Sequence, residues 1–402
     1  MGSQGPSPNS NNADLPQPWI ETPLIPSVPL SRIAGCNIFL KLENLQPSGS
    51  FKSRGIGNMM LLVASSSPED SKKEIHFYCS SEGNAGLACA TTAATLNKKA
   101  TIVLPVTASP VVIEKLVALG AEVIKAGTNW PEADAHLRNV CLGQSHDSQV
   151  QAIYVPPFDH ADIWSGAATL VDEIATQLPA VLKKSPHEVI LDDDQERQQP
   201  VIDAIVCNVG GGGLLNGVME GLERRKIPLV GHDGLPTKVL ALETIGADSL
   251  NVSVKRGTHS TLPGITSIAK SLGATRVSRR TWEWAEKYSA LGGGGAQDEE
   301  KKLISATVTD GEAALACVKF ADDARMLIEV SCGATIATVY NGDLRKYLGG
   351  KDTSDEEWRK RNVVLVVCGG NNTNLETMER YREEYAGAFD KSVAVVNGSG
   401  KG

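Results

Sequence analysis

The sequence has little of what several classes of protein require. It carries 39 Lys and Arg against 47 Asp and Glu, a formal net charge of −8, and so lacks the basic excess that binds a nucleic-acid backbone. It has no apolar run near the roughly 20 residues that cross a bilayer. Only 5% of its 402 residues are aromatic, yet 41% are hydrophobic, which is enough for two folded cores. We therefore expect a folded protein with neither a nucleic-acid nor a membrane partner.

The eight cysteines have no CxxC spacing, and the seven histidines have no HxH or HExxH spacing. The cysteines are therefore expected to be reduced core residues of an intracellular protein, and a catalytic transition metal is not expected. The first 31 residues contain no Lys or Arg, which a secretory signal or a mitochondrial presequence needs. We expect a cytoplasmic location.

The chain does contain a regular alternation of short apolar runs and helical patterns, which is typical of parallel sheets covered by helices on both faces. The expected strands are Ile75–Cys79, Thr101–Pro105, Glu122–Ala126, Ala152–Val155, Ala204–Val209, Lys238–Glu243, Met326–Glu329 and Val363–Cys368. The expected helices are Asn84–Leu96, Val111–Leu119, Ala133–Cys141, Ile163–Gln177, Leu214–Arg224, Gly311–Ala324, Ala334–Tyr347 and Asn374–Tyr385. The pattern predicts an α/β fold.

Two glycine-rich turns follow buried strands. After Ala204–Val209 come Gly210, Gly211, Gly212 and Gly213, and then a helical segment. A turn without side chains at a helix N-terminus presents backbone N–H groups to an anion, so this turn is a candidate phosphate site. It matches neither the P-loop nor G-x-G-x-x-G, and a tight turn that binds nothing explains the pattern equally well. In the second turn, Cys368 stands at the carboxyl end of a strand, where ligands bind in open parallel sheets, although a small buried side chain is the simpler interpretation.

A lysine and a second loop add to this pattern. Residues 40–57 read LKLENLQPSGSFKSRGIG and place Lys52 just before a helical stretch. A helix N-terminus disfavours a cation, so this position suits a functional amine, although a solvated lysine also fits. The loop SSEGNAG, at residues 80–86, again follows a strand and precedes a helix. Ser81, Asn84 and the free N–H groups of such a loop suit a carboxylate.

Together these four features resemble the fold-type II pyridoxal-phosphate enzymes, in particular the serine/threonine dehydratase family and most closely its fungal-type L-serine dehydratases. The resemblance covers about residues 20–385 and is carried by PSGSFKSRGIGN (Pro47–Asn58), the GGGG loop and the VVCGG strand end. It implies two open, twisted α/β domains like those of tryptophan synthase β, with pyridoxal 5′-phosphate in the cleft between them, and a homodimer. We expect a small domain over residues 45–160, a large domain over residues 19–44 and 161–390, and disordered tails over residues 1–18 and 391–402.

The resemblance also implies roles for individual residues. Lys52 would hold the cofactor as an aldimine, Phe51 would pack against its ring, and Cys368 would face its pyridine nitrogen. The phosphate would be held by the four glycines Gly210, Gly211, Gly212 and Gly213. The substrate carboxylate would be bound by Ser81, Gly83, Asn84 and Ala85, with Asn84 also bonding the phenolic oxygen of the cofactor. A monovalent cation such as potassium would be held by Glu243, Ala247, Ser249, Leu272 and Ala274.

Some residues depart from the family pattern. Glu82 stands where dehydratases of this group carry Ala, Gly or Ser. A carboxylate there could act as a second acid or base with a raised pKa, could recognise a larger substrate, or could simply point to solvent. Relatives usually have Trp-Glu-Gly-His where this chain has Trp164-Ser-Gly-Ala167, a Lys at the position of Gly264, and Glu-Pro-Ala-Cys where this chain has Glu329-Val-Ser-Cys332. These changes fit either an enlarged pocket or neutral drift.

The resulting prediction is a pyridoxal-phosphate-dependent ammonia-lyase that eliminates the β-substituent of a serine- or threonine-like amino acid and yields a 2-keto acid and ammonia, with Lys52 as the base. Three alternatives stay open. The first is a racemase or epimerase that uses Lys52 and Glu82 as two bases. The second is a biosynthetic enzyme that performs β-replacement on a non-standard amino acid. The third is a ligand-binding protein without catalysis.

Overall fold

The computed structural model describes residues 15–66, 73–143, 149–184, 200–292, 301–350 and 352–390. The chain folds into two compact units. The first comprises Met1–Ile20 and Lys52–Gly166, and the second comprises Glu21–Phe51 and Ala167–Gly402. The borders expected from the sequence, near residues 45 and 161, fall several residues earlier. No helix in the described ranges is long and apolar enough to span a membrane.

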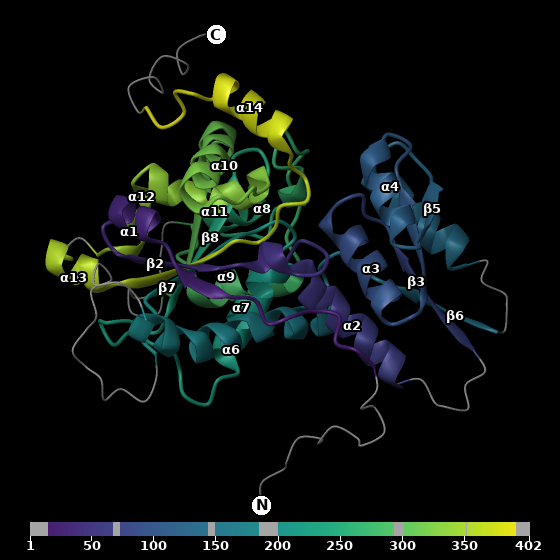
Figure 1. Cartoon of the computed structure of the whole chain (residues 1–402), viewed down its shortest axis with the longest axis horizontal. Helices are drawn as coiled ribbons and strands as arrows, with labels where there is room; N and C mark the ends of the chain where they lie inside the picture. The colour runs from purple at the N-terminus through teal and green to yellow at the C-terminus, as the bar shows by residue number, and fades with distance from the viewer. Residues whose placement is uncertain are drawn as a thin grey trace, which may run out of the picture. The chain divides into compact units, whose positions relative to one another are not determined.

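The first unit is built on a four-stranded parallel sheet in the order β5-β4-β3-β6 (Figure 1). Its strands are β3 (Glu74–Cys79), β4 (Lys99–Leu104), β5 (Glu122–Lys125) and β6 (Val150–Tyr154). Its helices are α2 (Lys52–Ser66), α3 (Asn84–Thr95), α4 (Pro110–Ala118), α5 (Trp130–His136) and a π-helical turn (Leu137–Cys141). Helix α6 (Ala161–Lys184) begins in this unit and ends in the other.

The second unit contains a six-stranded sheet in the order β1-β2-β10-β7-β8-β9, parallel except for β1. The strands are β1 (Leu24–Pro26), β2 (Asn37–Lys41), β7 (Ala204–Asn208), β8 (Lys238–Thr244), β9 (Leu303–Val308) and β10 (Asn362–Val366). Helices α10 (Asp310–Ala324) and α11 (Val330–Tyr340) lie on one side of this sheet, and α7 (Gly213–Glu223) lies on the other (Figure 1). The remaining helices are α1 (Val28–Ala34), α8 (Ser249–Arg256), α9 (Arg279–Tyr288), α12 (Asp343–Leu348), α13 (Asp355–Lys360) and α14 (Leu375–Glu384), with 3₁₀ turns at Glu43–Leu45 and Lys270–Leu272.

The α/β prediction with parallel sheets is confirmed, but some elements differ from expectation. Met326–Glu329 is not a strand, and Glu329 instead precedes the first turn of α11. Strand β10 offers no free edge to this segment, because it is already paired with β2 and β7. The helix expected over Ala334–Tyr347 is two helices, because the chain turns at Gly342, whose φ is 77°.

The expected tails fall mostly outside the described residues, which exclude 1–14 and 391–402. Residues 15–18 are described, and Leu15 packs against the core of the first unit. The tail expectation therefore does not hold for this segment, because its apolar side chain finds a partner there.

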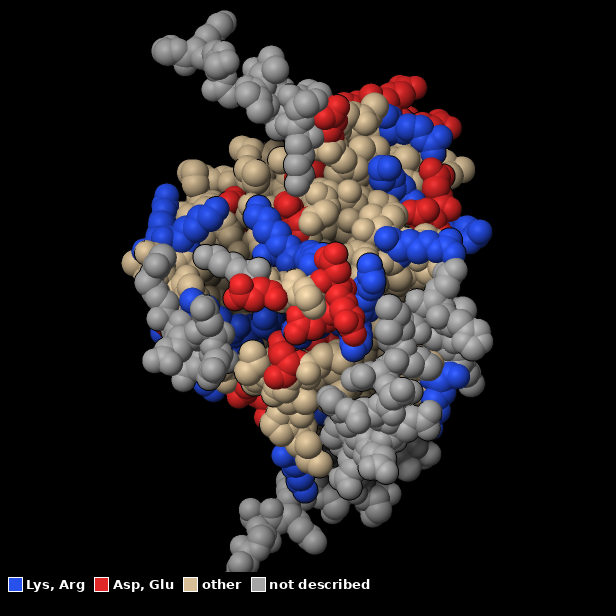
Figure 2. Space-filling model, turned by 90° about the vertical axis from the view of Figure 1, so that its left-hand side faces the viewer, with Lys and Arg blue, Asp and Glu red and all other residues tan. Residues whose placement is uncertain are grey.

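All eight cysteines are free thiols in this structure, as expected. Seven of them are buried, and Cys141 in the π-helical turn is partly exposed. On the face shown in Figure 2, Lys and Arg side chains lie among Asp and Glu over the described residues, without an extended patch of one sign.

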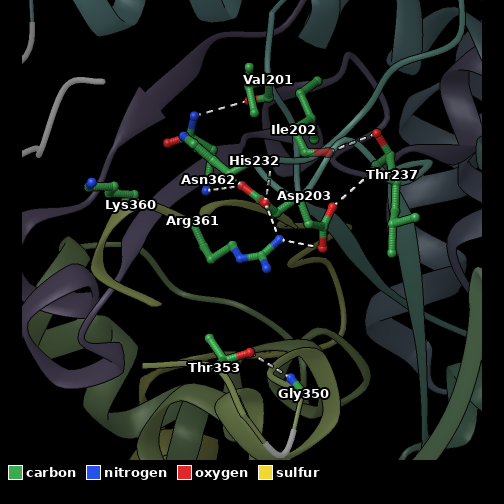
Figure 3. Close-up of polar contacts among 12 residues, drawn as sticks. Val201, Ile202, Asp203, His232, Thr237, Gly350, Thr353, Lys360, Arg361 and Asn362 are labelled. Atoms are coloured by element: carbon green, nitrogen blue, oxygen red, sulfur yellow. Dashed lines mark hydrogen bonds and ion pairs between the residues drawn. The ribbon is translucent and has the colours of Figure 1, made fainter. Parts of the chain in front are cut away.

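A polar cluster joins the amino ends of β7 and β10 (Figure 3). The Asp203 carboxylate accepts hydrogen bonds from His232 Nδ1 and from Arg361 Nη1, each at 2.7 Å. It also accepts from the backbone N–H of Asn362 at 2.7 Å. Arg361 pairs in addition with Asp233, at 2.8 Å. Since the carboxyl ends of these strands lead to the glycine loop and to Cys368, this cluster belongs to the opposite edge of the sheet.

Candidate active site

Lys52 is the first residue of α2, in the first unit. Its Nζ donates a hydrogen bond to the carbonyl oxygen of Pro157 at 2.5 Å and lies 6.0 Å from the centre of the Phe158 ring. Trp164 holds the same segment, because its indole N–H donates to the Phe158 carbonyl at 2.9 Å. The lysine amine is therefore held by the segment that follows β6. The sequence interpretation did not assign Pro157 or Phe158, although their position after a strand end is the signal that could have found them.

Gly55, in the signature around Lys52, serves helix packing. A Cβ at Gly55 would lie 2.6 Å from the carbonyl oxygen of Ile163 at the start of α6. A Cβ at Gly166 would overlap the backbone of Arg54, and Asn58 donates to the carbonyl of Asp162 at 2.8 Å. Close packing of α2 on the first turns of α6 thus explains why this part of the motif needs small residues.

The Ser81–Ala85 loop connects β3 to α3 in the same unit, and α3 packs against α2. Ser81 is partly buried, Asn84 and Ala85 are buried, and Glu82 is exposed. The hydroxyl of Ser81 accepts from the backbone N–H of Gly83 at 3.3 Å. The N-terminus of α3 begins at Asn84 and has no acidic residue in its first turn. This loop can bind a carboxylate, because its N–H groups and the helix dipole favour an anion.

The tetraglycine turn lies in the second unit, between β7 and α7. Gly212 has φ of 101°, and a Cβ there would overlap the Thr281 hydroxyl. In the described part of the chain, the backbone N–H groups from Gly210 to Leu215 donate to no protein acceptor. Orphaned donors at a helix N-terminus form a site for an anion such as a phosphate.

A polar network fixes this turn from behind. Ser278 donates its backbone N–H to the carbonyl of Gly211 at 2.9 Å. The Asn216 amide donates to the Ser278 hydroxyl at 3.1 Å and accepts from the Thr281 hydroxyl at 2.9 Å. All three side chains are buried. The sequence interpretation missed this network, since Ser278 and Thr281 are far from the glycines in the chain.

Cys368 lies two residues beyond β10 and is 3% exposed. Its Sγ accepts from the Asn208 amide at 3.0 Å, and its backbone N–H donates to Cys332 Sγ at 3.3 Å. A side-chain hydrogen bond between the Cys368 and Cys332 thiols, together with burial, raises the pKa of the Cys368 thiol well above its ordinary value. The thiol is therefore uncharged at neutral pH. Asn208 and Cys332 were not assigned from the sequence.

Phe51 is tied to the same strand end, because its backbone N–H donates to the Cys368 carbonyl at 2.9 Å. Two hydroxyls near this point, Ser50 Oγ and Ser331 Oγ, are buried without a hydrogen-bond partner among the described residues. Ser50 pairs with Gly369 in an isolated antiparallel β-bridge. The backbone carbonyl of Ser331 accepts a hydrogen bond from the Asn208 amide. Unpaired buried hydroxyls carry a free-energy cost, which a polar ligand or a water bound here would relieve.

Three of the residues expected to hold a monovalent cation lie at the start of α8 or just before it: Glu243, Ala247 and Ser249. Glu243 is fully buried, and its two carboxylate oxygens accept from the backbone N–H groups of Leu250 and Asn251, at 2.9 and 2.7 Å. Burial raises the pKa of Glu243 to about 8 although these two hydrogen bonds favour the ionised form. Ser249 Oγ is buried and unpaired within the described chain.

The other expected cation ligands are also placed. Ala247 is buried in the turn that follows β8. Leu272 accepts from the N–H of Ala274 at 2.7 Å, and a Cβ at Gly210 would lie 3.2 Å from the Cα of Leu272. The Leu272 turn therefore borders the tetraglycine turn.

The residues that depart from the family pattern have different surroundings in the structure. Ser165 and Gly264 are exposed, and the side chain of Ala167 packs against α7 at Gly217. Of these changes, only Ser331 contributes an unpaired buried hydroxyl near Cys368.

Comparisons with known proteins agree with this site. A family model described as "Pyridoxal-phosphate dependent enzyme" matches residues 15–369. The chain is 36% identical over 351 residues to the catabolic L-serine/threonine dehydratase of Saccharomyces cerevisiae, covering 86% of each chain. It is 39% identical over 360 residues to the serine dehydratase-like protein of Homo sapiens, covering 90% of this chain and 93% of that one.

A solved structure gives the same result. The crystal structure of a fungal L-serine ammonia-lyase from Rhizomucor miehei superposes with a TM-score of 0.72 and 31% identity, over 92% of this chain and 99% of that one. The family match covers most of the chain, including Lys52, both anion-binding loops and Cys368. The chain belongs to the family of pyridoxal-phosphate-dependent enzymes.

Proposed function

We propose that this enzyme is an ammonia-lyase that eliminates the β-hydroxyl of a serine- or threonine-like amino acid and releases a 2-keto acid and ammonia. The observation that carries the proposal is the buried, uncharged thiol of Cys368 at the strand end, held by Asn208. The similar enzymes from yeast and Rhizomucor are named for the dehydration or deamination of serine and threonine.

The residues of this structure fit pyridoxal 5′-phosphate. The orphaned N–H groups of Gly210, Gly211, Gly212 and Gly213 suit its phosphate, and the unpaired Ser50 and Ser331 hydroxyls mark a polar site near Cys368. Lys52 would hold its aldehyde carbon, Phe51 would pack on its ring, and Asn84 would bond its phenolic oxygen. When bound, this cofactor withdraws electrons from the Cα of the amino acid. The uncharged thiol of Cys368 would face the ring nitrogen and would limit that withdrawal, which would favour prompt loss of the β-substituent over transamination.

The protein's own groups then have defined tasks. The Ser81–Ala85 loop binds the substrate carboxylate through backbone N–H groups and the Ser81 hydroxyl. Lys52 takes the Cα proton, and the carbonyl of Pro157 holds its ammonium form, since that carbonyl already accepts from Nζ. We propose Glu82 as a second proton-transfer group, because it is the ionisable residue of the loop.

The test is an NMR time course of L-serine, L-threonine and their D-forms with the cofactor-loaded enzyme in D₂O. We expect 2-keto acid and ammonia from an L-substrate, and a loss of at least about a thousandfold in kcat for Lys52→Ala. Borohydride reduction followed by peptide mass spectrometry should place the cofactor on Lys52 in the wild-type chain. Deuterium at Cα without keto acid would overturn the lyase in favour of the isomerase, and an added nucleophile found at Cβ would favour β-replacement. Glu82→Ala, measured in parallel, tests the second group.

We further propose a bound monovalent cation such as potassium, held by Glu243, Ser249 and the backbone carbonyls of Ala247, Leu272 and Ala274. The unpaired, buried Ser249 hydroxyl supports this site. Potassium should raise the melting temperature above its value in a tetramethylammonium buffer of equal ionic strength, and Ser249→Ala should reduce that difference. An equal melting temperature in both buffers would contradict the site.

We also propose that the enzyme is a cytoplasmic homodimer. Eight free thiols are typical of a reducing compartment, and the resemblance to serine dehydratases implies the homodimer. Light scattering on the purified holoenzyme measures the mass, and fluorescence microscopy of a tagged chain gives the location. A monomeric mass would contradict the dimer.

A further inference from the structure

Asp134 of α5 is a buried carboxylate with three side-chain hydrogen bonds, all within the first unit. Its Oδ1 accepts from Ser80 Oγ at 2.5 Å and from the Tyr154 hydroxyl at 2.8 Å. Its Oδ2 accepts from Arg138 Nε at 2.7 Å. The residue is 8% exposed. Such a buried carboxylate is tolerated because each oxygen is paired.

Ser80 links this carboxylate to the substrate loop. It is 1% exposed, and it stands between the end of β3 and Ser81. Ser81 packs closely on the first turn of α3. Its carbonyl oxygen lies where a Cβ at Gly86 would stand, so a glycine is needed there. The entry of the loop is therefore fixed at two points, the Ser80 hydroxyl and the Ser81 carbonyl.

The position of Asp134 is itself fixed. Helix α5 is capped by Asn129, whose side chain accepts from the backbone N–H of Glu132 at 3.1 Å. A small apolar cluster of Val103, Ala133 and Leu137 packs α5 and the π-helical turn on the sheet. Asp134 is thus a rigid acceptor on which Ser80 can be oriented.

The charge of Asp134 is balanced where it lies. Arg138 donates to Asp134 through Nε and to the Tyr154 hydroxyl through Nη2 at 2.7 Å, and its guanidinium lies 4.0 Å from the centre of the Tyr154 ring. Burial opposes ionisation, but the hydrogen bonds from Ser80, Arg138 and Tyr154 hold the pKa of Asp134 below its ordinary value. A carboxylate that was not neutralised would repel a second carboxylate bound at the neighbouring loop.

We propose that Asp134 is a positioning residue for substrate binding: through the Ser80 hydroxyl it fixes the entry of the Ser81–Ala85 loop, so that the loop's N–H groups converge on the carboxylate of the amino acid. This proposal rests on the proposed function, which assigns the carboxylate to this loop. Tyr154 and Arg138 also hydrogen-bond to Asp134, but of its three partners only Ser80 leads directly into the loop.

The experiment compares three variants of the full-length holoenzyme: Ser80→Ala, Tyr154→Phe and Asp134→Ala. The first two each remove one hydrogen bond to Asp134 Oδ1, but only Ser80 is joined to the loop. For Ser80→Ala we expect the KM for L-serine to rise about five- to tenfold, as for the loss of one hydrogen bond, with kcat changed less than about twofold. Tyr154→Phe should leave KM nearly unchanged. Asp134→Ala should raise KM at least as much as Ser80→Ala does. The double variant that combines Ser80→Ala with Asp134→Ala should have the same KM as Asp134→Ala alone.

Amide hydrogen exchange gives a readout that is independent of turnover. The amides of residues 82–86 should exchange faster in Ser80→Ala than in Tyr154→Phe or in the wild-type chain. An equal rise of KM in Tyr154→Phe and Ser80→Ala would overturn the proposal. So would a Ser80→Ala variant with a lower melting temperature but unchanged KM and unchanged exchange. If the wild-type enzyme does not turn over serine, the proposed function fails and the exchange data alone decide whether Asp134 orders the loop.

Discussion

Three glycines near the candidate site are required for two distinct structural reasons. Gly212 has a left-handed φ of 101° with the Thr281 side chain directly beside it, so it permits a backbone shape that other residues strain to adopt. Gly55 and Gly166 instead allow α2 and α6 to approach closely. The first kind shapes a ligand site, and the second kind shapes the support on which Lys52 stands.

Gly212→Ala should therefore strongly weaken phosphate binding at the turn. The left-handed conformation costs about 1–2 kcal/mol for a residue with a Cβ, and overlap with Thr281 forces the loop or α9 to move. We expect cofactor affinity, measured by fluorescence titration, to fall at least about a hundredfold. Gly264→Ala is the matched control, since a Cβ there meets no atom within 4 Å. Unchanged affinity in Gly212→Ala would mean that the cofactor phosphate binds elsewhere.

The sequence predicted the residues of the candidate site that lie in compact motifs, and it missed those that hold the motifs in place. Lys52 and Gly210–Gly213 stand in runs that are rare enough to be noticed. Asn208 and Asn216 flank the tetraglycine turn, but an isolated amide has no distinctive pattern. Ser80 and Asp134 are more than fifty residues apart, so only the folded β3 and α5 bring them together.

At the scale of elements, the predicted strands and helices were those whose apolar run is bounded by turn residues. Strand β2 was missed because Lys41 ends it, although this lysine is fully buried. Its Nζ donates to Glu173 at 2.6 Å and to Gln177 at 3.0 Å on α6. A buried charge pair of distant residues makes a core strand look like a surface segment, and no local pattern reveals it.

The cluster around Asp203 should make the second unit sensitive to acid. Burial raises the pKa of Asp203, but hydrogen bonds from His232 and Asn362 and the His232 charge outweigh it, so the pKa lies below its ordinary value. A carboxyl whose pKa is lowered by folding binds fewer protons in the native state. Its contribution to stability is therefore complete above the unfolded pKa of about 3.9 and is lost as the pH falls through the lower native value.

Asp203→Asn tests this arrangement by urea unfolding at several pH values. We expect the free energy of unfolding at neutral pH to fall by about 3 kcal/mol, because Arg361 and His232 lose a buried partner. The pH dependence below about pH 4 should become shallower than in the wild-type chain. Asp233→Asn, at a more exposed partner of Arg361, should cost less. Equal losses in both variants would show that burial of Asp203 does not matter.

For the whole molecule, cofactor binding should add to stability by mass action. At a free pyridoxal phosphate concentration of about 100 times Kd, the gain is about 2.7 kcal/mol. Calorimetry of the apo and loaded forms should show this as a higher melting temperature. The gain should shrink in Lys52→Ala and fall to about 0.4 kcal/mol or less in Gly212→Ala. An identical melting temperature with and without cofactor in the wild-type chain would contradict binding to the native state.

The eight thiols also set how the whole protein responds to electrophiles. Seven are buried, and Cys141 is the partly exposed one. Burial and the charge of Glu122 raise the pKa of Cys141, so alkylation should be slow at neutral pH and faster under mildly alkaline conditions. The unaltered chain therefore offers a single position for a maleimide dye. Because Cys141 ends the π-helical turn that follows α5, such a dye would report optically on the part of the fold that carries Asp134.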